Sequence, residues 1–113
     1  MSASIVPETT VAEAHRRAAD GEVLLIDVRE PEEWAHGHAE QAQLVPLGGL
    51  DPAAVPTDRP VLVVCRSGGR SGQAVGALCD RGVDATNVAG GMNAWEQAGL
   101  PMVNEGPDAP TVV

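Results

Sequence analysis

The chain has 113 residues, of which 43% are hydrophobic, a length and composition that fit one compact domain with a modest core. Its 7 basic side chains are all arginines and stand against 16 acidic residues, so the formal net charge is −9. This negative balance argues against nucleic acids and anionic membrane surfaces as principal partners. The absence of lysine also excludes a Walker-type phosphate loop, which requires one.

Other features of the composition predict where the protein works. Only two cysteines are present, no apolar stretch is long enough to span a bilayer, and the first residues lack the basic and then apolar pattern of a leader. We therefore expect a reducing, cytoplasmic setting, with no membrane and no nucleic acid among the partners.

The first half of the chain is predicted to alternate between strands and helices. Ile5-Val6 favours a short edge strand. Thr10 and Glu13 form a capping box, which predicts a helix that runs to Gly21. Further elements are expected at residues 23–28 (a buried strand), 30–37 (a short helix), 44–45 (a brief strand) and 51–55 (a one-turn helix).

The second half continues this alternation. Strands are predicted at residues 61–64 and 85–88, and helices at residues 71–82 and 92–98. The whole pattern indicates one α/β domain over residues 1–103, with a small, mainly parallel sheet of about five strands flanked by helices on both faces. Residues 104–113 are expected to form a disordered tail.

The only obvious nucleophile, Cys65, lies between a predicted strand and a predicted helix. The run Val-Leu-Val-Val before it is short, apolar and rich in β-branched residues, as in a strand buried on both faces of a parallel sheet. The carboxyl ends of such strands are where ligands bind in open α/β sheets, and the helix that follows offers unpaired N–H groups. This position favours an anion-binding site around the thiol.

The residues after Cys65 are suited to holding an anion. Gly68 and Gly69 can adopt positive φ angles, which allow successive N–H groups to point inward, and Arg66 and Arg70 add positive charge. Cysteines in such surroundings have a pKa of about 3.5–7.5, so we expect Cys65 to be a thiolate at neutral pH. The other cysteine, Cys79, is expected in the core because it falls on the apolar stripe of its helix.

Three motifs in this order resemble the rhodanese (sulfurtransferase) family. The first is the six-residue loop from Cys65 to Arg70, between a strand and a helix. The second is Asp-Val-Arg-Glu-Pro-Glu-Glu-Trp at residues 27–34, followed by Gly37-His38, and the third is Gly-Gly-Met-Asn-Ala-Trp at residues 90–95. The resemblance covers about residues 5–100 and implies a rhodanese-like fold.

This resemblance also implies a reaction. The Cys65 thiolate is expected to take a sulfur atom from thiosulfate or a persulfide donor, keep it as a persulfide, and pass it to cyanide, a thiol or a sulfur-carrier protein, without a cofactor. Arg66 and Arg70 would hold the anionic end of the donor. The backbone N–H groups from Ser67 through Ser71, including those of Gly68 and Gly69, would stabilise the persulfide.

Arg29 has two possible roles. Its place after a predicted strand end allows it to border the entrance of the site and contact substrate, or to make a surface ion pair with one of the many acids.

Two other functions fit parts of the same pattern. Loops that run from a cysteine to an arginine also bind phosphate-like oxyanions in phosphatases and arsenate reductases. The pattern of those enzymes has five residues between the cysteine and the arginine, whereas only four separate Cys65 from Arg70. The third hypothesis is a noncatalytic binding module, but the presence of Cys65 together with both arginines argues against it. Metal binding is disfavoured because no Cys-x-x-Cys pair occurs and His36 and His38 are two residues apart.

Overall fold

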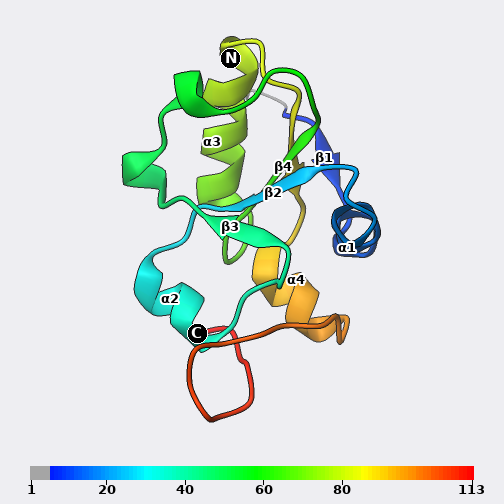
Figure 1. Cartoon of the computed structure of the whole chain (residues 1–113), viewed down its shortest axis with the longest axis vertical. Helices are drawn as coiled ribbons and strands as arrows, with labels where there is room; N and C mark the ends of the chain where they lie inside the picture. Colours follow the sequence, from blue (N-terminus) through cyan, green and yellow to red (C-terminus); the bar gives the residue numbers. More distant parts are fainter. Residues whose placement is uncertain (1–5) are drawn as a thin grey trace.

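The computed structural model describes residues 6–113, and within them five strands form one parallel sheet (Figure 1). The strand order across the sheet is β1-β5-β4-β2-β3, and all neighbouring pairs are parallel. The strands are β1 (Glu8–Thr9), β2 (Leu24–Asp27), β3 (Ala42–Leu44), β4 (Val61–Val64) and β5 (Ala85–Val88). This sheet confirms the predicted fold class.

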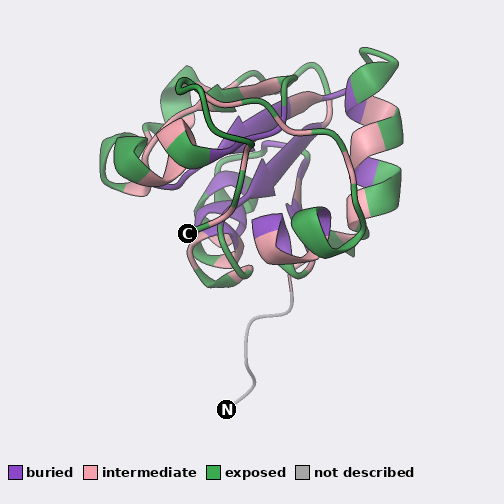
Figure 2. Ribbon diagram, turned by 90° about the horizontal axis from the view of Figure 1, so that it is seen from below, coloured by how far each residue is buried: buried purple, intermediate pink, exposed green. Residues whose placement is uncertain are grey.

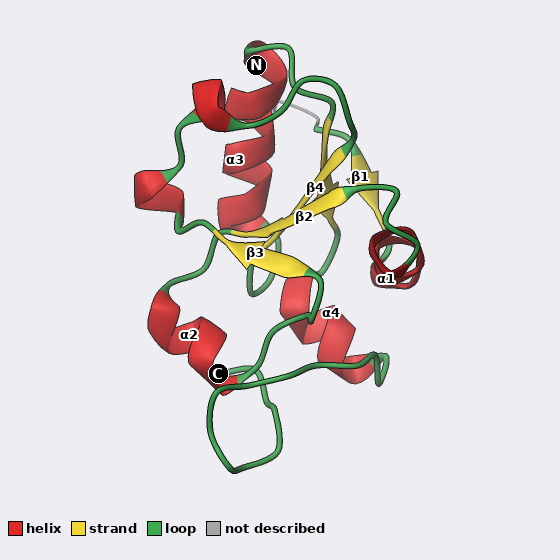
Figure 3. Ribbon diagram, in the orientation of Figure 1, coloured by secondary structure: helices red, strands yellow, loops and turns green. Residues whose placement is uncertain are grey.

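Helices cover both faces of the sheet (Figure 3). Buried residues of α1 and α4, among them Ala14 and Trp95, pack in one core cluster, and those of α3, among them Val75 and Leu78, pack in another. The helices are α1 (Val11–Ala19), α2 (Pro31–His36), α3 (Gly69–Asp80) and α4 (Gly91–Gln97), with 3₁₀ turns η1 (Leu47–Gly49) and η2 (Pro52–Ala54). Figure 2 shows the burial concentrated in the strands and on the inner sides of the helices.

Strand β4 is the middle of the sheet and carries the predicted nucleophile at its end. It pairs with β5 on one side and β2 on the other, and all its residues are buried. Leu62 and Val64 face the α1–α4 cluster, whereas Val61 and Val63 face the α3 cluster, as the two-residue period of a strand requires. Asp27 is paired with Val64, so the ends of β2 and β4 meet as predicted.

Several element boundaries differ from those that the sequence predicts, among them the strand expected at residues 44–45, which is observed as β3 (Ala42–Leu44). The expected strand at Ile5-Val6 lies partly outside the described residues, and the observed edge strand β1 follows Pro7, whose carbonyl accepts a 2.8 Å hydrogen bond from Asn87 N–H. Helix α3 begins at Gly69, ahead of the predicted start, because Gly68 adopts a left-handed conformation with φ of 112° and serves as the N-cap. Helix α4 likewise begins one residue early.

Residues 104–113, for which the sequence predicts disorder, have defined contacts with the rest of the chain. Thr111 N–H donates to the His36 carbonyl at 2.9 Å, and Val112 packs against the α1–α4 cluster. The close approach depends on Gly37, since a Cβ there would lie 2.5 Å from the Thr111 carbonyl oxygen. An irregular segment of this kind has no periodicity that would reveal its packing.

None of the helices within residues 6–113 is long and apolar enough to cross a membrane.

Candidate active site

The Cys65 thiol lies at the floor of the loop that joins β4 to α3. Cys65 is 2% exposed, whereas Arg66, Ser67 and Gly69 on the loop are exposed. The Gly68 N–H donates a hydrogen bond to Sγ at 3.0 Å. The loop therefore surrounds a buried sulfur with groups that remain open to solvent.

Hydrogen-bond donors decide the acidity of this thiol. Burial raises the pKa of Cys65, but the Ser71 hydroxyl and the backbone N–H groups of Ser71, Gly68 and Ser67 lower it by more, so that the pKa is below its usual value. The direction agrees with the prediction from the sequence. The cause is partly different from the predicted one. The sequence pointed to backbone amides and arginine charges, whereas in the structure backbone amides and the Ser71 hydroxyl lower the pKa.

The start of α4 holds the loop in this orientation. Met92 N–H donates to the Cys65 carbonyl at 2.8 Å, and Asn93 N–H donates to the Arg66 carbonyl at 2.9 Å. These free N–H groups of the first helical turn thus bind the carbonyl edge of the loop, which leaves its N–H edge for the sulfur. Gly91 permits the approach, since it has φ of 57° and a Cβ there would lie 2.5 Å from the Cys65 carbonyl oxygen.

Arg70 is held by a carboxylate that the sequence did not single out as its partner. Its guanidinium makes two parallel hydrogen bonds to Glu33 of α2, at 2.7 and 2.8 Å. Hydrogen bonding to Arg70 is the main cause that lowers the pKa of Glu33 to about 2, and the same pair raises the pKa of Arg70. An anionic donor must therefore compete with Glu33 for this arginine.

The ion pair predicts an acid-sensitive contribution to stability. Because the folded-state pKa of Glu33 is about 2, below the usual 4.5, the pair stabilises the fold above pH 4.5 and loses this effect as the pH falls toward 2. We expect a double-mutant cycle of Glu33→Gln and Arg70→Gln to give a coupling energy of about 1 kcal/mol at neutral pH. Urea unfolding at neutral pH and near pH 2 would measure it, and a coupling that survives at the lower pH would contradict this interpretation.

The remaining two arginines of the predicted site lie in different surroundings. Arg66 is exposed, and its Nε donates to the Val113 carbonyl at 2.9 Å. Arg29 is fully buried, with its guanidinium 2.8 Å from the Asp27 carboxylate and 2.8 Å from the Gly37 carbonyl oxygen. The ion pair with an acid that the sequence allowed for Arg29 is present, but it is buried rather than at the surface, because Asp27 holds Arg29 inside. Through these contacts Arg29 joins the end of β2 to the end of α2, and its contact with substrate stays a prediction.

Cys79 is also placed differently from the prediction. It is exposed, and its Sγ is 3.5 Å from the Ala85 carbonyl oxygen. The buried stripe of α3 is formed by Ala74, Val75 and Leu78, so Cys79 lies at the edge of that stripe rather than in the core. Both cysteines are free thiols.

Asn87, on the buried strand β5, is a polar neighbour of the nucleophile that the sequence reasoning missed. It is 3% exposed, and its Oδ1 lies 2.6 Å from the Ser71 hydroxyl oxygen. An amide side chain in the middle of a buried parallel strand must find polar partners, and this requirement is the signal that the sequence offered.

His38 packs against Trp34 at the end of α2. Its ring stacks on Trp34 with the centroids 3.5 Å apart, and Nδ1 is 2.8 Å from the Trp34 carbonyl oxygen. The ring is therefore engaged at the turn after α2.

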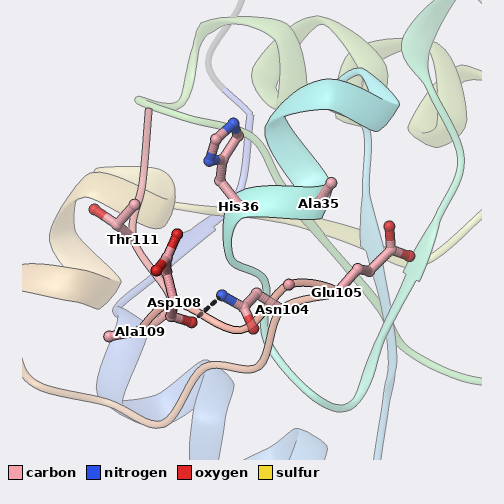
Figure 4. A pocket seen from close by; sticks show the side chains of 8 residues that line it. Ala35, His36, Asn104, Glu105, Asp108, Ala109 and Thr111 are labelled. Carbon is pink, nitrogen blue, oxygen red and sulfur yellow. Dashed lines mark hydrogen bonds between the residues drawn. The ribbon is translucent and has the colours of Figure 1, made fainter.

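A pocket of about 380 Å³ lies beside α2 and residues 104–111 (Figure 4), and Cys65 is not among the residues that line it. Within its lining, Asn104 Nδ2 donates a 2.6 Å hydrogen bond to the Asp108 carbonyl oxygen. In the part of the chain that the structure describes, no three His, Cys, Asp or Glu side chains come together as a set of metal ligands. The candidate site is therefore the loop from Cys65 to Arg70 rather than this pocket.

Comparisons with known proteins show which family the chain resembles. Residues 10–98 match the family described as "Rhodanese-like domain". A sulfurtransferase of Allochromatium vinosum is 41% identical over 92 residues, 78% of this chain and 86% of the relative, and the putative sulfurtransferase YtwF of Bacillus subtilis is 41% identical over 91 residues, with 78% and 87% covered. The chain covers only 47% of another relative, the uncharacterised protein slr1261 of Synechocystis, to which it is 40% identical over 84 residues.

The fold is shared with solved structures as well. The crystal structure of a rhodanese-related protein from Thermoplasma volcanium has a TM-score of 0.81 and 28% sequence identity, and the match covers 88% of this chain and 99% of that one.

Proposed function

The chain belongs to the rhodanese-like family, and from this premise we propose that it is a sulfurtransferase that carries the transferred sulfur on Cys65 as a persulfide. Family membership and the relatives named sulfurtransferase support the transferase role. The observation that carries the proposal is the convergence of donors on Sγ: the Ser71 hydroxyl and the backbone N–H groups of Ser67, Gly68 and Ser71.

The proposed reaction has two half-reactions. The Cys65 thiolate attacks the outer sulfur of thiosulfate, the sulfur–sulfur bond of the donor breaks, and sulfite leaves with the bonding electron pair. The terminal sulfur of the persulfide now carries the negative charge. Cyanide, a thiol or a sulfur-carrier protein then attacks that sulfur, the new sulfur–sulfur bond breaks, and Cys65 leaves as a thiolate. Neither step needs a cofactor.

The loop groups have separate tasks in this proposal. The N–H groups of Ser67, Gly68, Gly69 and Ser71 form the ring that stabilises the anionic sulfur in both half-reactions. Arg66, which is exposed at the start of the loop, would bind the anionic end of the donor. Arg70, fixed by Glu33, contributes positive charge beside the ring.

Arg29 is proposed as a support of the site rather than a substrate ligand. Its contacts with Asp27 and Gly37 are buried, and they connect the strand end next to Cys65 with the segment that carries Glu33.

Initial-rate kinetics test the proposed function. A covalently stored sulfur divides the reaction into two half-reactions, so thiocyanate formation from thiosulfate and cyanide should give parallel double-reciprocal lines. Intersecting lines would argue for direct transfer. Absence of turnover with thiosulfate and with persulfide donors, in a folded protein, would favour a noncatalytic binding module.

A further inference from the structure

The Ser71 hydroxyl lies between two buried acceptors. Its oxygen is 3.2 Å from Cys65 Sγ and 2.6 Å from Asn87 Oδ1. Ser71 is fully buried, and the other two residues are nearly so, so their polar groups must find hydrogen-bond partners inside the protein. A serine hydroxyl has one proton to donate. It can serve the cysteine or the amide oxygen, but not both at once.

The orientation of the Asn87 amide is fixed by its nitrogen. Nδ2 donates to the Gly68 carbonyl oxygen and to Glu8 Oε2, each at 3.2 Å. Rotating the amide by half a turn would bring Oδ1 against these two acceptors. The oxygen of Asn87 must therefore face Ser71, and it can only accept.

The two ionisation states of Cys65 use this arrangement differently. In the thiol state, the S–H donates to the Ser71 oxygen and the Ser71 O–H donates to Asn87 Oδ1, so that every group has a partner. In the thiolate state, the sulfur already accepts from the Gly68 N–H, and it competes with Oδ1 for the Ser71 proton. If Ser71 turns to the sulfur, two oxygen lone pairs face each other across 2.6 Å. Asn87 thus favours the thiol.

We propose that Asn87 is a positioning residue that competes with Cys65 for the Ser71 proton and so restrains the ionisation of the nucleophile. The consequence for sulfur transfer rests on the proposed function. Thiolates lose intrinsic nucleophilicity as their pKa falls, and an attacking thiol works best with a pKa near the ambient pH. The loop amides lower the pKa of Cys65, and Asn87 offsets part of this effect. The Cys65 thiolate thereby keeps more of its nucleophilicity for the attack on the donor.

Charged groups approach the nucleophile from several directions. Two follow it on its own loop, and the others come from three different elements. They are Arg66 of the loop, Arg70 where the loop enters α3, Glu33 of α2, Asp27 at the end of β2 with Arg29 after it, and Glu8 of β1. None of these charged residues is substituted in the variants below, so the formal charge around Cys65 is the same in all of them.

The test is the pH dependence of Cys65 alkylation in a Cys79→Ser background, which removes the exposed thiol. Iodoacetamide labelling, quantified on the Cys65 peptide by mass spectrometry, gives an inflection for each variant. Asn87→Ala is expected to move the inflection down by about 0.5–1 pH unit, the equivalent of one hydrogen bond. Ser71→Ala is expected to move it up, because it removes a donor to the thiolate.

The double variant separates competition from structural disturbance. Loss of the Asn87 contact with Gly68 could also disturb the loop, but that effect would occur with or without the hydroxyl. Competition predicts that Asn87→Ala produces no downward shift in the Ser71→Ala protein. An unchanged or raised inflection in the Asn87 variant, or an equal shift in both backgrounds, would overturn the proposal.

Asn87→Val, which suits a strand better, provides a second variant if the first is unstable, and circular dichroism would verify folding. Alkylation needs no sulfur donor, so this result is independent of whether the protein transfers sulfur.

Discussion

Cys65→Ser is expected to abolish sulfur transfer. A serine hydroxyl at this position cannot form the persulfide, and loss of the nucleophile in covalent catalysis should lower turnover by more than about 10³-fold. The substitution removes one buried sulfur and leaves the loop amides in place, so the fold should persist. Thiocyanate formation from thiosulfate and cyanide would measure the effect.

Cys79→Ser is the matched control for that experiment. It makes the same chemical change at an exposed thiol on the far half of α3, where Sγ is 3.5 Å from the Ala85 carbonyl oxygen. Activity should remain within about twofold of the unmodified protein, since the site is distant from the loop. Loss of activity in this variant with retention in Cys65→Ser would reverse the assignment of the nucleophile.

Gly91→Ala is expected to be among the most destabilising single-methyl additions in the chain. Its Cβ would overlap the carbonyl oxygen of Cys65 at 2.5 Å and the carbonyl carbon of Arg66 at 2.7 Å, both of them backbone atoms. The positive φ adds about 1–2 kcal/mol of strain, and overpacking against backbone adds about 1–3 kcal/mol. We expect a loss of about 3 kcal/mol in urea unfolding, together with a loss of activity as the loop shifts.

Gly99→Ala separates these two effects. Gly99 follows the same helix α4 with φ of 71°, close to the 57° of Gly91, but a Cβ there would have nothing within 4 Å. This variant should show only the conformational cost of about 1 kcal/mol and should remain active. Equal destabilisation by both alanines would mean that the contact between α4 and the Cys65 loop contributes little.

The sheet and the position of the nucleophile could be predicted because they depend on local patterns. The apolar run at residues 61–64, its abrupt end at Cys65 and the glycines that follow specify a buried strand, a turn and a helix start. Parallel strands align their carboxyl ends, which brings Asp27 beside Val64. The strand, turn and helix start follow from residues that are close in sequence, and the meeting of the β2 and β4 ends follows from the common direction of parallel strands.

The partners of the arginines could not be predicted from local patterns. Arg70 and Glu33 are 37 positions apart, and their pairing depends on how α2 packs next to the loop. Arg29 has a carboxylate two residues before it, but only the fold shows that both are buried. Ser71 and Asn87 likewise meet through the alignment of α3 with β5, which no periodicity in the sequence reveals.

The central claim is that Cys65 stores a sulfur atom, and intact-mass measurement tests it most directly. The protein would be exposed to thiosulfate, desalted and weighed, then treated with cyanide and weighed again, with peptide mapping to locate the change. We expect the mass to increase by one sulfur atom, located on Cys65, and to return to its original value as thiocyanate is released. A protein that gains no mass from thiosulfate or a persulfide donor, or gains it on Cys79, would contradict the proposed role of the Cys65 loop.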